Sequence, residues 1–144
     1  TQIKIADPSF EPETFADGAR AAYEMIVSAF AKGDKEALRN LLNDEVYENF
    51  VAAIDEREAA GQTLESSIVA IKGTDIVEAG LNGKMAEVTV KFGTEMISVL
   101  RGSDGEPAPG QMTSTRLVTD IWTFARDTRS RDPNWLLIET RSEN

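Results

Sequence analysis

The stretch Met112–Arg141, MTSTRLVTDIWTFARDTRSRDPNWLLIETR, decides the fold of this chain. In its first half the even positions Val118, Trp122 and Phe124 are large and apolar, and threonines alternate with them. A repeat of two residues is typical of a half-buried strand. The pattern predicts a strand over residues 115–126 with a bulky inner face.

The second half of this stretch turns back on the first. Residues 127–134 carry no large apolar side chain, and Pro133 cannot donate a ladder hydrogen bond, so the strand must end before it. Trp135–Ile138 is then predicted to be the antiparallel partner strand. A hairpin with a tryptophan-rich face needs a covering layer, which we expect from the N-terminal part of the chain.

Three helices are predicted ahead of the sheet. Pro12 suits the first turn of a helix, and Gly33 ends that helix as a C-cap. Asp34 caps a short second helix, and a third runs from Asn43 or Asp44 to Gly61. The apolar stripes contain Phe15, Ala19, Ala22, Tyr23, Ile26, Val27 and Phe30, then Leu38, Leu41 and Leu42, and finally Val46, Tyr47, Phe50 and Ile54. The charged run Glu56, Arg57 and Glu58 is interpreted as the solvent-exposed face of the third helix.

Beyond the helices the apolar residues alternate, which predicts strands. Residues 64–72 and 74–79 form one interrupted strand that bends at Gly73, and residues 80–83 turn the chain. Residues 85–100 form the next strand. The inward side chains predicted for it are Ala86, Val88, Val90, Phe92 and Met96.

Helices followed by about four antiparallel strands make an α+β architecture. We expect a single domain in which residues 1–10 are an N-terminal extension, 11–61 the helical part and 62–144 the sheet. A polar loop at residues 101–111 interrupts the sheet. Long strands with glycine bends curl, and helices on a curled sheet leave a conical cavity, as in nuclear-transport-factor-two-like folds. Such a cavity is a common place for a ligand.

The composition excludes several classes of function. With 15 Lys and Arg against 25 Asp and Glu, the formal charge of -10 disfavours nucleic acid as a partner. The chain has neither cysteine nor histidine, which removes thiolate chemistry, Ser-His and Cys-His arrangements and the commonest metal ligand. We therefore expect no catalytic residues, no metal site and no cofactor.

No apolar run approaches the roughly 20 residues that a membrane helix needs, and no signal peptide is recognised. Because the chain begins at Thr1, we expect an excised domain with targeting or membrane segments upstream.

Three segments resemble a known family: Asp7–Asp34, DPSFEPETFADGARAAYEMIVSAFAKGD; Ala37–Phe50, ALRNLLNDEVYENF; and Leu117–Thr140, LVTDIWTFARDTRSRDPNWLLIET. Together they are similar to the C-terminal domain of the Tim44 family of mitochondrial inner-membrane translocase subunits and their bacterial relatives. The hairpin motif, WTFARD followed by SRDPNW, is the most specific piece. The strong acidity makes the chain look like the bacterial, alphaproteobacterial branch.

The resemblance implies a cone-shaped α+β domain with a large apolar pocket, located at the inner membrane as a peripheral or anchored protein. It implies a role in protein translocation or in assembly of a membrane complex, with a membrane protein or chaperone as partner and a lipid or amphiphile as a further ligand. It places membrane attachment at the N-terminal edge. Here that edge is residues 1–6, TQIKIA, whose one cation and two isoleucines do not make an anchor on their own.

Two interpretations of the large apolar side chains stay open: they line a pocket, or they form the core between helices and sheet. The pocket candidates are Tyr23, Val27, Phe30, Tyr47, Phe50, Ile54, Phe92, Trp122 and Phe124. A cluster in and before the final turn, Arg126, Arg129 and Arg131, is a candidate contact for a lipid headgroup or an acidic partner. The alternative is a solvated turn of mixed charge.

Asp120 lies in the same alternating row as Trp122 and Phe124, so we expect it to face inward. It is either a general acid or base, or a carboxylate paired with Arg116 or with a neighbouring strand. Three functions follow: a non-enzymatic adaptor at the inner membrane, a carrier of lipid or another small hydrophobe, and a pocket enzyme that uses Asp120 with Tyr23 or Tyr47. The oligomeric state stays open.

Overall fold

The computed structural model describes residues 10–143. Three helices precede four strands: α2 Pro12–Lys32, α3 Lys35–Arg39, α4 Asp44–Ala59, β1 Thr63–Asn82, β2 Met85–Arg101, β3 Arg116–Asp127 and β4 Leu136–Glu143. The strands form one antiparallel sheet in the order β1-β2-β3-β4. The predicted α+β fold is confirmed. Of the predicted N-terminal extension, only Phe10 is among the described residues, and the TQIKIA edge lies outside them.

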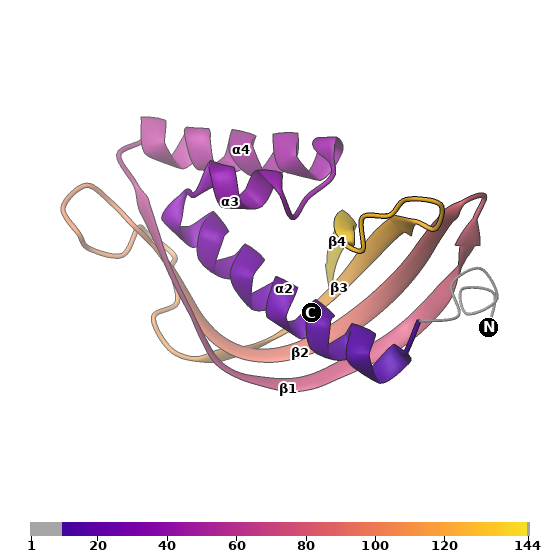
Figure 1. Ribbon diagram of the computed structural model, residues 1–144. Coiled ribbons are helices and arrows are strands. Elements are labelled where there is room, and N and C mark those ends of the chain that lie inside the picture. The colour runs from indigo at the N-terminus through magenta and orange to yellow at the C-terminus, as the bar shows by residue number, and fades with distance from the viewer. Residues whose placement is uncertain (1–9, 144) are drawn as a thin grey trace.

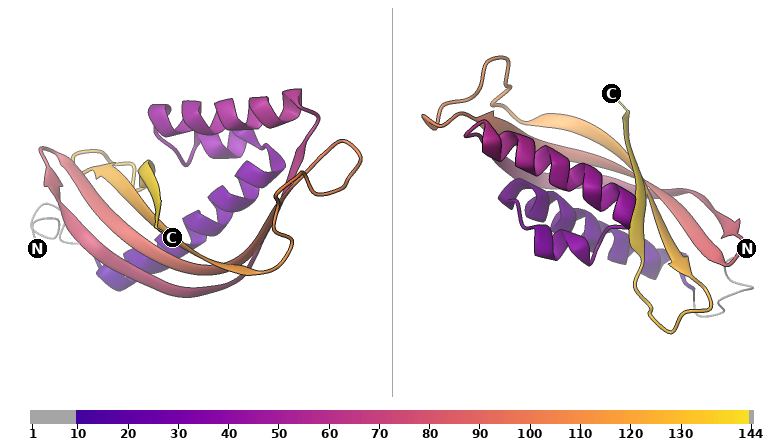
Figure 2. Two further views of the ribbon diagram at one scale, coloured as in Figure 1. Left: turned by 180° about the vertical axis from the view of Figure 1, so that it is seen from behind. Right: turned by 90° about the horizontal axis from the view of Figure 1, so that it is seen from above.

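The sheet is strongly curved, and α2 runs across its concave side (Figure 1). All three helices lie on that side, with α4 farther from the sheet than α2 (Figures 1 and 2). No helix within residues 10–143 is long and apolar enough to cross a membrane.

The helix ends follow the predicted caps. Gly33 adopts the left-handed conformation, with φ 72°, that favours glycine at a C-cap. The Asp34 carboxylate accepts a hydrogen bond from the N–H of Ala37 at 3.1 Å, and the side chain of Asn43 accepts one from the N–H of Val46 at 3.0 Å. These bonds satisfy backbone donors of the first turns of α3 and α4, where no carbonyl is available within the helix.

The first two strands are longer than predicted. The prediction that residues 80–83 all turn the chain is wrong, because Gly80 pairs with Glu87 and β1 continues to Asn82. Only two residues make the turn of this hairpin, and Gly83 supplies the positive φ of 63° that so tight a turn requires.

The bend predicted at Gly73 coincides with an interruption of the β1–β2 register. The pairing shifts between Ile71 and Gly73, and again between Ile68 and Ala70 and between Ile76 and Glu78. An extra residue on one strand bends it and increases its twist. These three irregularities explain how a strand of 20 residues follows a strongly curved sheet.

Aromatic side chains fill the space between α2 and the middle of the sheet. Tyr23 stacks on Phe92 with ring centroids 4.4 Å apart and tilts against Trp122 at 4.6 Å. Tyr23 and Phe92 are completely buried, and Trp122 is 6% exposed. All five inward side chains predicted for β2 are buried, which confirms its period-two pattern.

One charged residue of α4 is buried against prediction. Arg57 is only 8% exposed, so its assignment to the solvent-exposed face is wrong. Its guanidinium lies 4.9 Å from the centroid of the Phe30 ring and donates to the backbone carbonyls of Phe30 and Ala31, at the C-terminal end of α2. The C-terminal end of a helix attracts a cation because its last carbonyls have no partner within the helix. The pattern of charged residues along α4 cannot show this contact, because the carbonyls belong to α2.

Candidate functional site

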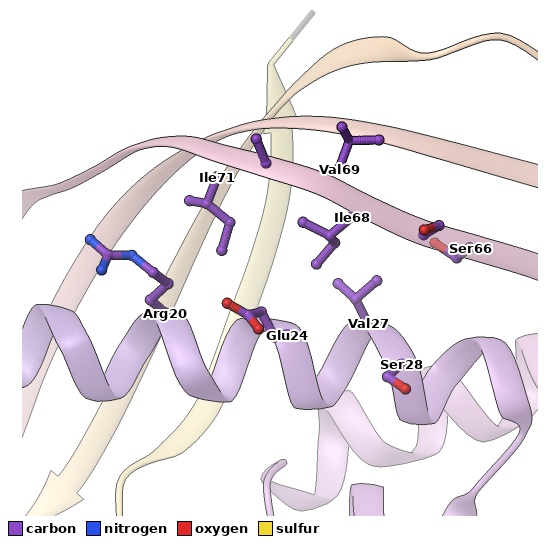
Figure 3. A pocket seen from close by; sticks show the side chains of 10 residues that line it. Arg20, Glu24, Val27, Ser28, Ser66, Ile68, Val69 and Ile71 are labelled. Carbon is purple, nitrogen blue, oxygen red and sulfur yellow. The ribbon is translucent and has the colours of Figure 1, made fainter.

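A first groove of about 590 Å³ separates α2 from β1. Figure 3 shows Glu24 and Val27 pointing from α2 toward the strand, Ile68 and Ile71 pointing from β1 toward the helix, and Val69 pointing away. The lining residues are Arg20, Glu24, Val27, Ser28, Ser66, Ser67, Ile68, Val69, Ala70 and Ile71. The groove is therefore mixed in chemistry, with three serines and two charges beside aliphatic side chains.

The two charges of the first groove differ in their partners. Arg20 forms an ion pair with Asp17 at 3.6 Å and donates to the hydroxyl of Thr74 on β1 at 3.2 Å. Glu24 is exposed and forms no ion pair with any residue that the structure describes. The uncompensated charge of this groove is thus negative.

A second groove, of about 490 Å³, lies between the start of α2 and the β3–β4 turn. Its aromatic wall joins Phe15 to Trp135 at a centroid distance of 4.7 Å and to Phe124 at 6.1 Å, both edge to face. The full lining is Phe10, Glu11, Thr14, Phe15, Gly18, Ala19, Ala22, Leu41, Phe124, Arg126, Pro133, Asn134 and Trp135. Because α2 presents only small residues at 18, 19 and 22, the groove stays open between the aromatic side chains.

Arg126 belongs to the rim of the second groove. Its guanidinium donates to the backbone carbonyls of Ser130 and Asp132, at 3.2 and 3.1 Å, and so holds the turn between β3 and β4 in place. Arg129 and Arg131 are exposed in that turn and do not line the groove. Of the three predicted arginines, the structure thus brings only Arg126 to a groove.

The nine apolar pocket candidates do not gather in one pocket. Val27 lines the first groove and Phe124 the second. The other seven line neither of these two grooves: Tyr23, Ile54, Phe92 and Trp122 are buried, and Phe30, Tyr47 and Phe50 are half-buried against the core. Sequence reasoning did not assign Phe10, Phe15 or Trp135 to a pocket, although Trp135 stands in the hairpin motif and Phe15 opens the helical stripe.

Asp120 faces inward as predicted and connects three elements. It accepts a hydrogen bond of 2.6 Å from the Tyr23 hydroxyl on α2 and one of 3.0 Å from the Ser142 hydroxyl on β4. The expected partner on a neighbouring strand is confirmed, whereas Arg116 forms no ion pair with Asp120 among the described residues. Burial, together with the hydrogen bond to Asp120, raises the pKa of the Tyr23 hydroxyl well above its usual value. Tyr23 is therefore a permanent donor at neutral pH, which suits a structural link better than acid–base catalysis.

Tyr23→Phe is expected to lower the free energy of unfolding at pH 7 by about 1.5–3 kcal/mol, the range for a hydrogen bond to a charged group. The raised pKa also predicts a pH dependence. Above about pH 10 the tyrosine ionises in the unfolded chain but not in the folded one, so the wild type loses stability there. The stability advantage of the wild type over the variant should shrink by about 1.4 kcal/mol per pH unit above pH 10. Urea unfolding of both proteins between pH 8 and 11 measures this difference in the free energy of unfolding. Tyr47→Phe is the control, because it keeps the Tyr23–Asp120 bond. A difference that stays constant across that pH range would contradict the prediction.

No group of three or more acidic side chains within residues 10–143 is placed to hold a metal ion.

Comparison with known proteins identifies relatives of nearly the whole chain. The family model of the Tim44-like domain matches residues 1–142. Mouse mitochondrial import inner membrane translocase subunit TIM44 is 22% identical over 142 residues, which cover 96% of this chain and 31% of that protein. Subunit TIM44-1 of Arabidopsis thaliana is 24% identical over 121 residues, which cover 84% of this chain and 26% of that protein. The chain therefore spans less than a third of the length of either relative.

A solved structure shows the same fold. The crystal structure of the intermembrane space region of the chloroplast protein ARC6 superposes with a TM-score of 0.65, covering 94% of this chain and 98% of that one. The sequences are 14% identical, so the likeness concerns the arrangement of helices and sheet and carries no assignment of function.

Proposed function

The chain belongs to the Tim44-like domain family, and from this we propose that it is a non-enzymatic adaptor domain at an inner membrane, which binds a segment of a partner protein in its second groove. The proposed partner is a membrane protein of a translocation or assembly complex, or a chaperone. The two relatives, both named as subunits of a mitochondrial import inner membrane translocase, support this location and this class of partner. The acidic charge of -10 supports the bacterial branch, and with it the bacterial inner membrane.

The observation that carries the proposal is the chemistry of the second groove. Its walls are aromatic, with Phe15 and Trp135 in edge-to-face contact, and its rim carries a carboxylate, Glu11, as well as the guanidinium of Arg126. Aromatic side chains are enriched at the centre of protein interfaces, where they contribute much of the binding free energy. A rim with both signs of charge suits a polypeptide, which carries polar groups of both kinds, better than an anionic headgroup.

A carrier of lipid or another small hydrophobe is the second candidate, because the lining of the second groove is more apolar than that of the first. The enzyme interpretation has less support. Tyr23 and Asp120 line neither groove, and the Tyr23 hydroxyl is already bonded to Asp120. That the chain is not an enzyme stays a prediction.

Gly18 offers a way to close the second groove without disturbing the fold. It is exposed on α2, and a Cβ added there meets no atom within 4 Å. Gly18→Trp should fill the groove with an indole ring. Gly18→Ala is the matched control, since it adds only a methyl group; we expect it to raise the free energy of unfolding by about 0.5–1 kcal/mol through its higher helix propensity.

The test uses these two variants and the wild type as baits on gently solubilised inner membranes. We expect wild type and Gly18→Ala to retain the same near-stoichiometric membrane protein or chaperone, and Gly18→Trp to retain it at least about tenfold less. Equal retention by Gly18→Trp would remove the groove from the proposal. If no protein is retained but vesicles of phosphatidylethanolamine and phosphatidylglycerol lose lipid to the wild type and not to Gly18→Trp, the carrier function replaces the adaptor.

A further inference from the structure

The first residues of β1 have no backbone partner on their outer edge among residues 10–143. β1 is the first strand of the sheet order and has a neighbour, β2, on one side only. Within residues 10–143 no backbone hydrogen bond connects β1 to any element other than β2. Such an edge presents a row of free N–H and C=O groups that another extended chain can pair with.

Most of this edge is protected against such pairing. Proteins blunt exposed edges with bulges and lysines. In β1 all three register irregularities, together with Lys72, follow Ile68. Before them the register is unbroken from Thr63, opposite Arg101, to Ile68, opposite Met96, and Val69 is the unpaired residue of the first irregularity. The regular segment, residues 63–69 up to and including that bulge residue, is thus the part of the edge that can accept another strand.

The first groove runs beside the end of the regular segment, where residues 66–69 line it. Ile68 and Val27 face each other across it, while Val69, which is 52% exposed, points to the opposite side (Figure 3). Side chains of an added strand would alternate in the same way. Those on the helix side would contact Val27 and Ile68, and those on the other side would lie next to Val69.

The charges beside β1 select the occupant. Three cations beside it are already in ion pairs: Arg20 with Asp17, Lys72 with Glu95, and Arg101 with Glu65 of β1 itself. The carboxylate of Glu24, which lines the first groove beside residues 66–71, forms no ion pair among the described residues.

We propose that the regular segment of β1 is a docking edge, at which an extended partner segment with alternating basic and apolar residues adds as a further strand of the sheet. Its basic side chains lie near Glu24, and its apolar ones pack on Val27 and Ile68. A second copy of this chain is the less suitable occupant. A two-fold axis would bring the same carboxylates together on a chain of net charge -10. The docking edge and the second groove are separate sites, so each can fail without the other.

The probe is a capped synthetic peptide of about seven residues, the usual length of a strand, in which lysine and valine alternate. We expect it to bind the 144-residue chain and to slow hydrogen exchange of backbone amides within residues 63–69. The same peptide with alternate backbone amides methylated keeps its charge and side chains but cannot form the ladder, and should bind at least about tenfold more weakly. A peptide of alternating glutamate and valine should not bind.

Two pairs of variants locate the site. Val69 and Val77 are both unpaired bulge residues of β1 and both 52% exposed, but Val69 ends the regular segment and Val77 lies beyond it. Val69→Lys should lower the affinity for the lysine–valine peptide about tenfold. Val77→Lys adds the same charge but should change that affinity less than about twofold. Glu24→Gln should lower the affinity for this peptide a few-fold, whereas Glu13→Gln, on the same helix, should leave the affinity unchanged.

Equal binding of the methylated peptide, exchange protection outside residues 63–69, or equal effects of the two lysine substitutions would each overturn the proposal. So would a dimer in sedimentation that Val69→Lys dissociates, since the edge would then pair with a second copy. Gly18→Trp should leave binding of the lysine–valine peptide unchanged, because it fills only the second groove. A failure of the docking edge can therefore be told apart from a failure of the proposed function.

Discussion

Phe92→Ala is expected to lower the free energy of unfolding by about 3–5 kcal/mol, the range for removing a fully buried phenylalanine ring. Phe92 has no exposed surface, stacks on Tyr23 and meets Trp122 edge to face at 5.9 Å. It lies on β2, which has paired neighbours on both sides, so little of the surroundings can collapse into the space left by the ring. Urea unfolding of variant and wild type at pH 7 measures the difference.

Phe50→Ala is the matched control for this loss. Phe50 was a candidate for the same pocket but is only half-buried, and its one aromatic neighbour is Phe30, 5.1 Å away. We expect its removal to cost about half as much as that of Phe92, in proportion to the area buried. If Phe92 lined an open ligand pocket, Phe92→Ala would cost no more than Phe50→Ala and would instead weaken ligand binding.

The comparison of Phe92→Ala with Phe50→Ala tests whether Phe92 belongs to the core or lines a pocket, which the sequence alone leaves open. Periodicity correctly placed Phe92 and Trp122 on the inner face of the sheet, because the direction of a side chain alternates along a strand. It could not say whether an inward ring meets another ring or an empty space. That depends on where α2 crosses the sheet, and Tyr23 fills the place in front of Phe92 and Trp122.

The second groove could not be predicted for a related reason. Phe15 and Trp135 lie 120 positions apart in the sequence and meet only because α2 begins beside the β3–β4 turn. The bond between Tyr23 and Asp120 likewise joins residues that are 97 positions apart. Local patterns fix which face a residue occupies, whereas contacts of this kind are fixed by the packing of one element on another.

Local sequence patterns, by contrast, were sufficient to predict the helix ends and the fold class. Asp34 is predicted to be a cap, and Asn43 is one of the two residues at which the third helix is predicted to begin. The side chains of both accept from backbone donors of the first turn, which needs no tertiary partner. The turn predicted at residues 80–83 is too long, because the sequence does not show which of the two glycines, Gly80 or Gly83, lies in the turn itself. Of the two, only Gly83 has a positive φ, and Gly80 pairs within the ladder.

Arg57→Ala is expected to lower the free energy of unfolding by about 3 kcal/mol, because it removes two hydrogen bonds from a charged and buried donor. One Nη atom of Arg57 donates to the carbonyls of Phe30 and Ala31, the latter at 2.9 Å, and thereby joins α4 to the end of α2. Burial lowers the pKa of the guanidinium, yet an arginine keeps its proton at any pH at which the protein is studied. Without the side chain, the Ala31 carbonyl would lose this partner at a half-buried helix end, whereas the Phe30 carbonyl would keep its bond of 3.2 Å from the N–H of Gly33.

Arg39→Ala is the control, because Arg39 makes the same kind of contact at the surface. Its guanidinium also lies 4.9 Å from an aromatic centroid, that of Tyr47, and it pairs with Asp44 at 2.8 Å, but its side chain is 53% exposed. Exposed pairs of this kind contribute about 1 kcal/mol or less. Arg57→Lys should fall between the two alanine variants, since an ammonium group keeps the charge but lies on a shorter side chain than the Nη atom that donates to both carbonyls. Urea unfolding of the three variants at pH 7 ranks them, and an Arg57→Ala loss no larger than that of Arg39→Ala would show that α4 does not depend on this residue for its attachment to α2.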